Sequence, residues 1–364
     1  MSGNFEQAKE FFAQGLGHYQ EGRFAQAEVN FIASLALLPG RVSTLTNLGA
    51  AQLKLGKPQD ALDPLEEALA QEPDNVEAWG HRATALAELG RHEEALACLE
   101  RALGLDGALG QAWSLRGRLL KDLGRPDEAA ASFEKALAHG ADQELNRYFL
   151  ASLDGRDIPA AAPRHYVEGL FDGYAEQFDK HLLQALNYRA PQVLVDQLRS
   201  MRPRFAAALD LGCGTGLCGS LLKPLAGRLD GVDLSSNMIA MAQALGVYDE
   251  LVQADLAHYL GTIDRRYDLV LAADVFIYVG ALEAVFAGVA RVMEAHGVFC
   301  FSVEPGDGGQ DLALRASLRY AHSEPYLRRL AGQHGFEVAH TASHPIREDR
   351  GTPIPGLFVW LVKR

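Results

Sequence analysis

The carboxyl-terminal half contains the stretch Asp210-Leu-Gly-Cys-Gly-Thr-Gly216, a glycine-rich turn at the end of the apolar run Ala207–Leu211. Glycine has no side chain, so the backbone of such a turn can come close to a ligand and point its N–H groups at it. The turn departs from the dinucleotide-binding pattern G-x-G-x-x-G, because Leu217 stands where that pattern has its last glycine. A ligand of nucleotide type is therefore expected here, and a nicotinamide dinucleotide is disfavoured.

Short β-rich runs alternate with helical stretches on both sides of this turn. The runs with the composition of strands are Ala207–Leu211, Leu229–Val232, Glu250–Gln253, Tyr267–Leu271, Gly297–Ser302, Phe336–Ala339 and Leu357–Val362. This alternation predicts a doubly wound, Rossmann-like α/β domain with a seven-stranded, mostly parallel sheet and helices on both faces. In that architecture, ligands bind at the carboxyl ends of the strands.

An acidic residue stands at or just after the end of each of the first four predicted strands. These residues are Asp210, Asp233, Asp255 and Asp274. Asp233 follows the first glycine of the turn by about 20 residues, the spacing at which a carboxylate accepts hydrogen bonds from the hydroxyls of a ribose. A single acid in such a place is more often a helix N-cap. Four in succession predict a binding site.

The glycine turn and the acids together resemble the class I S-adenosylmethionine-dependent methyltransferases. The resemblance implies S-adenosylmethionine as the cofactor and no metal. It places the methionine part at Asp210, Gly212, Gly214 and Gly216, the ribose at Asp233, the adenine at Leu234, Met238, Asp255 and Leu256, and the transferable methyl group at Ala273 and Asp274.

The segment before the turn carries aromatic residues at helical spacing, among them Phe171, Tyr174 and Phe178. One interpretation is a helix that buries these rings in the core. The segment is also similar to the amino-terminal lid of small-molecule methyltransferases. That resemblance implies a lid helix within about 164–200, with Tyr174 and Phe178 near the sulfonium, whose positive charge an aromatic face stabilises.

Methyl transfer is a one-step displacement, so alignment and exclusion of water can supply most of the rate. A general base is needed only if the acceptor must first lose a proton. The candidate catalytic residues are Tyr278 and His322, with His258 as a third, and for each the alternative is a polar residue without a catalytic role. No N/D-P-P-Y motif follows the fourth strand and no proline follows Cys300, which argues against methylation of nucleobases.

The first 150 residues repeat with a period of 34, and several columns of the repeat agree. The columns are Gly15, Gly49, Ala83 and Gly117; Gly22, Gly56, Gly90 and Gly124; Ala27, Ala61, Ala95 and Ala129; and Phe31, Leu65, Leu99 and Phe133. A glycine in the left-handed conformation can end a helix, so the second column predicts helical hairpins. The small residues would let paired helices approach closely, and the Phe/Leu column would fill the seam between neighbouring hairpins.

This periodicity resembles the tetratricopeptide repeat, with Trp79 and Trp113 at that family's tryptophan position. The resemblance implies an all-α solenoid of four repeats whose amphipathic cap completes the domain 1–153. The turn-rich stretch 154–163 is expected to be a linker, and 164–364 the methyltransferase domain. The whole chain is similar to predicted repeat-containing bacterial methyltransferases of the type 11 and type 12 groups.

The repeats imply a groove for a protein or peptide partner, although an oligomerisation arm or a brace for the second domain is the alternative. The groove carries Phe12, Leu16, Glu77 and His81 at positions where repeats that bind carboxylate tails have basic or Asn residues, although Asn47 fits. A basic or amphipathic partner segment is therefore expected.

Composition sets further limits. The chain of 364 residues has a net charge of −13, with the larger acidic excess in the repeats, which disfavours binding of nucleic acid. The four cysteines form no C-x-x-C pair, which is typical of a reducing, cytoplasmic location. No leader and no apolar run of about 20 residues predicts secretion or a membrane span. The sequence does not indicate an oligomeric state.

Two functions fit these observations. The first is a methyltransferase whose repeats recruit or position a small-molecule, carrier-bound or protein acceptor. The second is an interaction scaffold in which the methyltransferase fold is catalytically silent. The acids after four strands weaken the second hypothesis, because a scaffold does not need them. A nicotinamide-dependent oxidoreductase is a distant third possibility.

Overall fold

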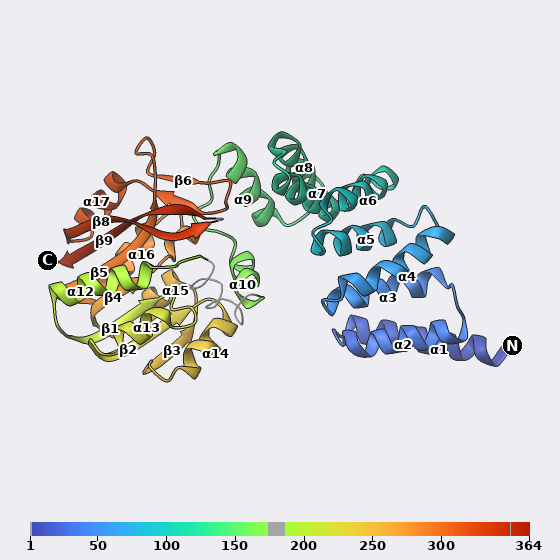
Figure 1. Cartoon of the computed structure of the whole chain (residues 1–364), viewed down its shortest axis with the longest axis horizontal. Helices are drawn as coiled ribbons and strands as arrows, with labels where there is room; N and C mark the ends of the chain where they lie inside the picture. The colour runs from blue at the N-terminus through green and yellow to red at the C-terminus, as the bar shows by residue number, and fades with distance from the viewer. Residues whose placement is uncertain (1, 174–185, 350) are drawn as a thin grey trace. The chain divides into compact units, whose positions relative to one another are not determined.

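The computed structural model describes residues 2–173, 186–349 and 351–364 (Figure 1). It divides into two compact units, Met1–Leu150 and Ala151–Arg364. The division falls inside α9, a few residues before the boundary expected from the sequence. Among the described residues, none of the helices has the length and apolarity needed to cross a lipid bilayer.

The first unit consists of helices that pair as successive hairpins, drawn from blue to teal in Figure 1, followed by α9 in green. They are α1 (Ser2–Gln20), α2 (Phe24–Leu37), α3 (Val42–Lys54), α4 (Pro58–Gln71), α5 (Val76–Glu88), α6 (His92–Leu105), α7 (Gly110–Asp122), α8 (Pro126–Ala138) and α9 (Gln143–Asp154). A glycine with positive φ separates the two helices of each hairpin, at Gly22, Gly56, Gly90 and Gly124. The predicted helical repeats are therefore confirmed.

The side chains of the repeat column Phe31, Leu65, Leu99 and Phe133 pack mainly between the two helices of their own hairpin. A Cβ at Gly49 would lie 2.5 Å from Leu65, and one at Gly117 would lie 2.5 Å from a ring carbon of Phe133. The space left by the absent glycine side chain is therefore filled by a side chain of the partner helix. Phe31 also clusters with Leu48 of the next hairpin, so the predicted role in the seam is right but incomplete.

The cap of the repeats is α9. Its Phe149 stacks on Phe133 of α8, with ring centroids 5.3 Å apart, and Tyr148 beside it is fully buried. The amphipathic face of α9 thus covers apolar surface that the last hairpin would otherwise expose to water.

The second unit alternates strands and helices. Its elements are α10 (Arg164–Asp172), α12 (Ala190–Met201), β1 (Phe205–Leu211), α13 (Leu217–Leu222), β2 (Ala226–Asp233), α14 (Ser236–Ala244), β3 (Glu250–Gln253), α15 (Leu256–Thr262), β4 (Tyr267–Ala272), the 3-10 turn η2 (Phe276–Tyr278), α16 (Glu283–Val292), β5 (Met293–Pro305), β6 (Leu312–Leu314), β7 (Tyr320–His322), α17 (Glu324–Gln333), β8 (Phe336–Asp349) and β9 (Thr352–Lys363).

The sheet runs β3-β2-β1-β4-β5 in parallel, and β9 continues it antiparallel to both β5 and β8. The seven predicted strands are all present, which confirms the fold class. The short strands β6 and β7 were not predicted, and β7 pairs with the last two residues of β5. β8 also extends beyond the run that was predicted. The prediction stopped short because the second half of the strand is polar and lacks the apolar run that marks a buried strand.

Side chains of the sheet alternate between two apolar cores. Phe299 and Phe301 of β5 face the core formed with α15, α16 and α17, whereas Cys300 faces the core formed with α12 and α13. Leu194 and Leu198 of α12 are fully buried in the second core. The second part of the predicted lid, from residue 190, is therefore a core helix.

The end of the predicted linker is part of the second unit. The Ala162 amide donates to the Tyr278 carbonyl at 2.9 Å, and the Gly280 amide donates to the Ala160 carbonyl at 2.9 Å. The Tyr320 hydroxyl donates to the Pro159 carbonyl at 2.8 Å. From Pro159 onward, the stretch expected to be a linker is therefore held by hydrogen bonds to the second unit.

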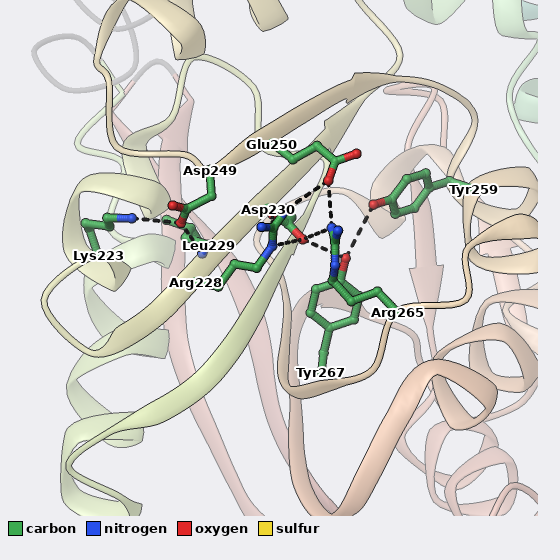
Figure 2. Close-up of polar contacts among 9 residues, drawn as sticks. All are labelled: Lys223, Arg228, Leu229, Asp230, Asp249, Glu250, Tyr259, Arg265 and Tyr267. Carbon is green, nitrogen blue, oxygen red and sulfur yellow. Dashed lines mark hydrogen bonds and ion pairs between the residues drawn. The ribbon is translucent and has the colours of Figure 1, made fainter.

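A polar network joins the middle of β2 to the beginnings of β3 and β4 (Figure 2). Asp230 of β2 is fully buried and accepts hydrogen bonds from Arg265 at 2.7 Å and from the Tyr267 hydroxyl at 2.9 Å. Arg265 and Arg228 both also contact Glu250 of β3, at 2.6 and 2.8 Å. The network thus fastens β2 to β3 and β4 on the amino-terminal side of Asp233.

Candidate cofactor-binding site

The carboxyl ends of the parallel strands open onto a pocket of about 350 Å³. The predicted site residues that line it are Gly212, Gly214, Asp233, Leu234, Met238, Asp255, Leu256, Ala273, Asp274 and Tyr278. Tyr174 and Phe178 lie outside the described residues. Asp210, Gly216, His322 and His258 are described but do not line the pocket.

The glycine turn requires glycine for two reasons. Gly212, Gly214 and Gly216 all have positive φ, of 69°, 52° and 96°. A Cβ at Gly212 would also lie 2.5 Å from Val275. A Cβ at Gly214 would meet nothing within 4 Å, so this glycine leaves open space at the pocket wall. The turn can therefore admit a ligand close to its backbone.

Asp233 ends β2 with its carboxylate held by two backbone donors. One oxygen accepts the Gly214 amide and the other accepts the Ser235 amide, both at 2.9 Å. Burial raises the pKa of this carboxyl group. Because each carboxylate oxygen can accept more than one hydrogen bond, both oxygens keep accepting capacity for hydroxyl donors in the pocket. This arrangement is suited to a ribose diol.

Asp255 has two roles. It caps α15 by accepting the His258 amide at 2.9 Å, and it also lines the pocket. The N-cap interpretation is therefore right for this acid without excluding a role in binding. His258 itself is exposed outside the pocket, so it is not placed to act as a base.

The helix α10 lines the pocket through Val167, Leu170 and Phe171, and none of its side chains is fully buried. This observation favours the lid interpretation over a core stripe. The helix is anchored by Asp172, whose carboxylate accepts the Ser235 hydroxyl at 2.5 Å, a contact that no spacing in the sequence indicates. Asn237 of α14 also donates its side-chain amide to the Asp172 carbonyl at 3.0 Å. The end of α10 is thus fixed to the start of α14.

Asp210 stands behind the glycine turn. It is 1% exposed, and one of its oxygens accepts the Tyr248 hydroxyl at 2.7 Å. The Tyr248 ring occupies the space that side chains at Gly219 and Gly231 would need. Asp210 therefore supports the turn from inside the domain, and the structure does not place it in contact with the pocket as the resemblance implied.

Burial raises the pKa of Asp210 from 3.8 to about 7. Between pH 3.8 and about pH 7, Asp210 keeps its proton in the folded chain but releases it in the unfolded chain. Asp210 therefore makes the free energy of unfolding fall as the pH rises, by about 1 kcal/mol per pH unit. Asp210→Asn is expected to lose that contribution. Urea unfolding of both proteins at pH 5 and pH 8 measures it, and an equal decrease in the variant would contradict it.

Asp274 follows β4 with a φ of 57°, which is rare for a residue with a side chain. Its amide donates to the Ser302 hydroxyl at 2.8 Å, and its carboxylate pairs with Arg347 at 2.5 Å. Arg347 also pairs with Glu304 at 2.6 Å, and Glu304 pairs with Arg315 at 2.9 Å. A buried chain of ion pairs therefore links the end of β4 to β5 and β8.

The two candidate catalytic residues differ in position. Tyr278 lines the pocket with its ring edge-on to Phe171, at a centroid distance of 5.5 Å. Burial raises the pKa of its hydroxyl, so the phenol is neutral near pH 7. It can donate a hydrogen bond but is poorly suited to remove a proton.

The assignment of His322 as a base is wrong in this structure. It is fully buried in β7, and its Nε2 atom contacts the carbonyl oxygens of Val279 and Gly280 at 3.0 and 2.9 Å. Burial lowers its pKa to about 4, so the ring is neutral and donates its Nε2 proton to these carbonyls. His322 therefore holds the loop after η2 in place. Sequence reasoning missed this role because the two carbonyls lie about 40 residues away in the chain.

Family models match both units. A model described as a methyltransferase domain matches residues 209–301, and models of the tetratricopeptide repeat match residues 52–119 and 110–138. The chain thus contains a methyltransferase domain and tetratricopeptide repeats.

Curated relatives resemble the methyltransferase domain. Methyltransferase-like protein 27 of Homo sapiens is 40% identical over 106 residues, which are 28% of this chain and 43% of the relative. The chain thus spans less than half of that relative. Malonyl-[acyl-carrier protein] O-methyltransferase of Enterobacter lignolyticus (strain SCF1) is 26% identical over 190 residues, 50% of this chain and 74% of the relative.

Solved structures also resemble this chain. Magnesium protoporphyrin IX methyltransferase from Synechocystis PCC 6803 with bound SAH aligns over 55% of this chain and 99% of its own length. The sequence identity is 20% and the TM-score is 0.43.

The pocket of the methyltransferase domain has the chemistry that S-adenosylmethionine requires. Asp233 offers two oriented acceptors, and Leu234, Met238 and Leu256 offer apolar surface for a purine. Within the described part of the domain, the side chains form no cluster of His, Cys, Asp or Glu that could hold a metal ion.

Proposed function

We propose that the chain transfers the methyl group of S-adenosylmethionine to an acceptor that enters the pocket beside α10. The observation that carries this proposal is the Asp233 carboxylate, fixed by the amides of Gly214 and Ser235 at the carboxyl edge of the sheet. Substrates of open α/β sheets bind at this edge.

The pocket residues would act mainly by position. When bound, the cofactor supplies an electrophilic methyl group on a positively charged sulfur. Asp233 orients the ribose, and the glycine turn permits close approach of the backbone. Phe171 and Tyr278 place aromatic groups on the acceptor side, where they exclude water from the reacting atoms. Such alignment can supply most of the rate of a one-step displacement.

The repeats favour an acceptor that is a protein or is delivered by one. The relative from Enterobacter lignolyticus is named for an acceptor of the second kind, an acyl group on a carrier protein. In α5, Glu77 is exposed and His81 is partly exposed, and burial lowers the pKa of His81, so the histidine is neutral near pH 7. Glu77 and Lys54 both act on this histidine, so the stretch carries charges of both signs, which suits an amphipathic segment.

The test is transfer of labelled methyl groups. The full chain is incubated with S-adenosylmethionine labelled at the methyl group and with a cell extract, and the protein and small-molecule fractions are counted. We expect label in one of these fractions, and none with Asp233→Ala. Failure of the wild-type chain to bind the cofactor would instead favour the scaffold hypothesis. Binding of polyuridine that persists at high salt would contradict the partner proposed for the repeats.

A further inference from the structure

The methyl-acceptor side of the pocket holds three arginines in different electrostatic settings. Arg347 is 2% exposed and is neutralised by Asp274 and Glu304. Arg164 is 62% exposed and pairs with Glu168 on its own helix. Arg319, between β6 and β7, is half-buried and lines the pocket. Within the described ranges, no carboxylate lies at ion-pair distance from it.

The cluster around Arg319 carries one positive charge in excess. Three guanidinium groups, of Arg315, Arg319 and Arg347, lie with two carboxylates, of Asp274 and Glu304. Glu304 pairs with Arg315 and Arg347, and Asp274 pairs with Arg347 and also attracts Arg319. Because the cluster has one guanidinium more than it has carboxylates, this position favours an anionic ligand group.

Arg319 also has a polar neighbour with a usable proton. Arg319 and Tyr278 line the same pocket, and burial raises the pKa of the Tyr278 hydroxyl, while the Arg319 guanidinium lowers it. The neutral phenol can donate its proton into the pocket. A guanidinium and a phenol side by side form a set of donors that matches the two oxygens of a carboxylate.

The described lining of the pocket offers no group placed to remove a proton from a neutral acceptor. Among its described lining residues, none is a histidine or a lysine. Asp274 is occupied by Arg347, and Asp233 and Asp255 lie at the ribose and adenine positions. An acceptor that is already an anion at neutral pH needs no base.

We propose that the methyl acceptor is a carboxylate, held by Arg319 and the Tyr278 hydroxyl. This inference rests on the proposed methyltransferase function. One carboxylate oxygen forms the new bond to the methyl carbon, while the carbon–sulfur bond breaks and its electron pair stays on sulfur. The products are a methyl ester and a thioether. The negative and positive charges cancel, and no proton moves.

The chemistry of the product tests this inference. Methyl esters release methanol in mild alkali, whereas methyl groups on ether oxygen, nitrogen or carbon stay attached. After transfer from methyl-labelled S-adenosylmethionine to a cell extract, we expect label that becomes volatile in alkali. Label that is transferred but stays non-volatile would overturn the carboxylate and leave the proposed function intact.

Variants test the role of Arg319. Arg319→Gln is expected to lower the rate of alkali-labile labelling by about tenfold or more, because it removes a charge-assisted hydrogen bond. Arg319→Lys should recover part of that rate, since it restores the charge. The control is Arg328→Gln, which removes an exposed arginine paired with Glu324 on α17 and should leave labelling unchanged.

Binding of S-adenosylhomocysteine, measured by calorimetry on each variant, separates the possible failures. Arg319→Gln should bind it as the wild type does, which also shows that the domain is folded. Alkali-labile labelling that is unchanged in Arg319→Gln would overturn the role of Arg319. Lack of binding or of any label transfer by the wild-type chain would overturn the proposed function, and this inference with it.

Discussion

Replacing Asp233 by alanine is expected to weaken binding of S-adenosylmethionine by about a hundredfold or more. The substitution removes the acceptors for two ribose hydroxyls, and each hydrogen bond to a charged group contributes about 1.5–3 kcal/mol. It also frees the Gly214 and Ser235 amides that hold the turn to the end of β2. Calorimetric titration of wild type and variant measures the loss.

Two further variants make this comparison specific. Asp233→Asn keeps one acceptor and should bind with intermediate affinity. Asp249→Ala removes an acid of the same domain that is partly exposed and pairs with Lys223, so its effect should be small. Affinity of Asp233→Ala equal to that of the wild type would show that this carboxylate does not hold the ribose.

Arg347→Met is expected to lower the free energy of unfolding of the methyltransferase domain by about 3–5 kcal/mol, the cost of leaving buried charges without a partner. Asp274 would lose the ion pair that the structure gives it, whereas Glu304 would keep Arg315. The backbone at Asp274, with its φ of 57°, would also lose a side-chain anchor. Urea unfolding followed by circular dichroism measures the change.

A compensating variant separates the charge from the packing. Arg347→Met combined with Asp274→Asn removes both members of the pair, so much of the lost stability should return, because neutral replacement of a buried ion pair is often tolerated. An unfolding curve of Arg347→Met that matches the wild type would contradict a stabilising role for the pair.

Local sequence signals predicted the parts of the fold that local chemistry decides. The column glycines Gly22, Gly56, Gly90 and Gly124 adopt the left-handed conformation that ends a helix. The turn Gly212–Gly216 follows a buried strand as expected. By contrast, β6 and β7 have three residues each, too few for a periodic pattern to appear.

The residues that sequence reasoning missed act through contacts between distant parts of the chain. Arg347 meets Asp274 from β8, Tyr248 meets Asp210 from the loop after α14, and Asp172 meets Ser235 from α10. No spacing rule marks such pairs. His322 was misassigned for the same reason, because its partner carbonyls belong to the loop after η2.

The most direct test of the account is titration of S-adenosylmethionine, S-adenosylhomocysteine and NAD into the full chain. We predict one binding site per chain for the two adenosyl compounds, with dissociation constants of about 1–100 µM, and no measurable heat with NAD. No binding of either adenosyl compound at millimolar concentration, or equal binding of NAD, would contradict the assignment of the pocket as the cofactor site of a methyltransferase.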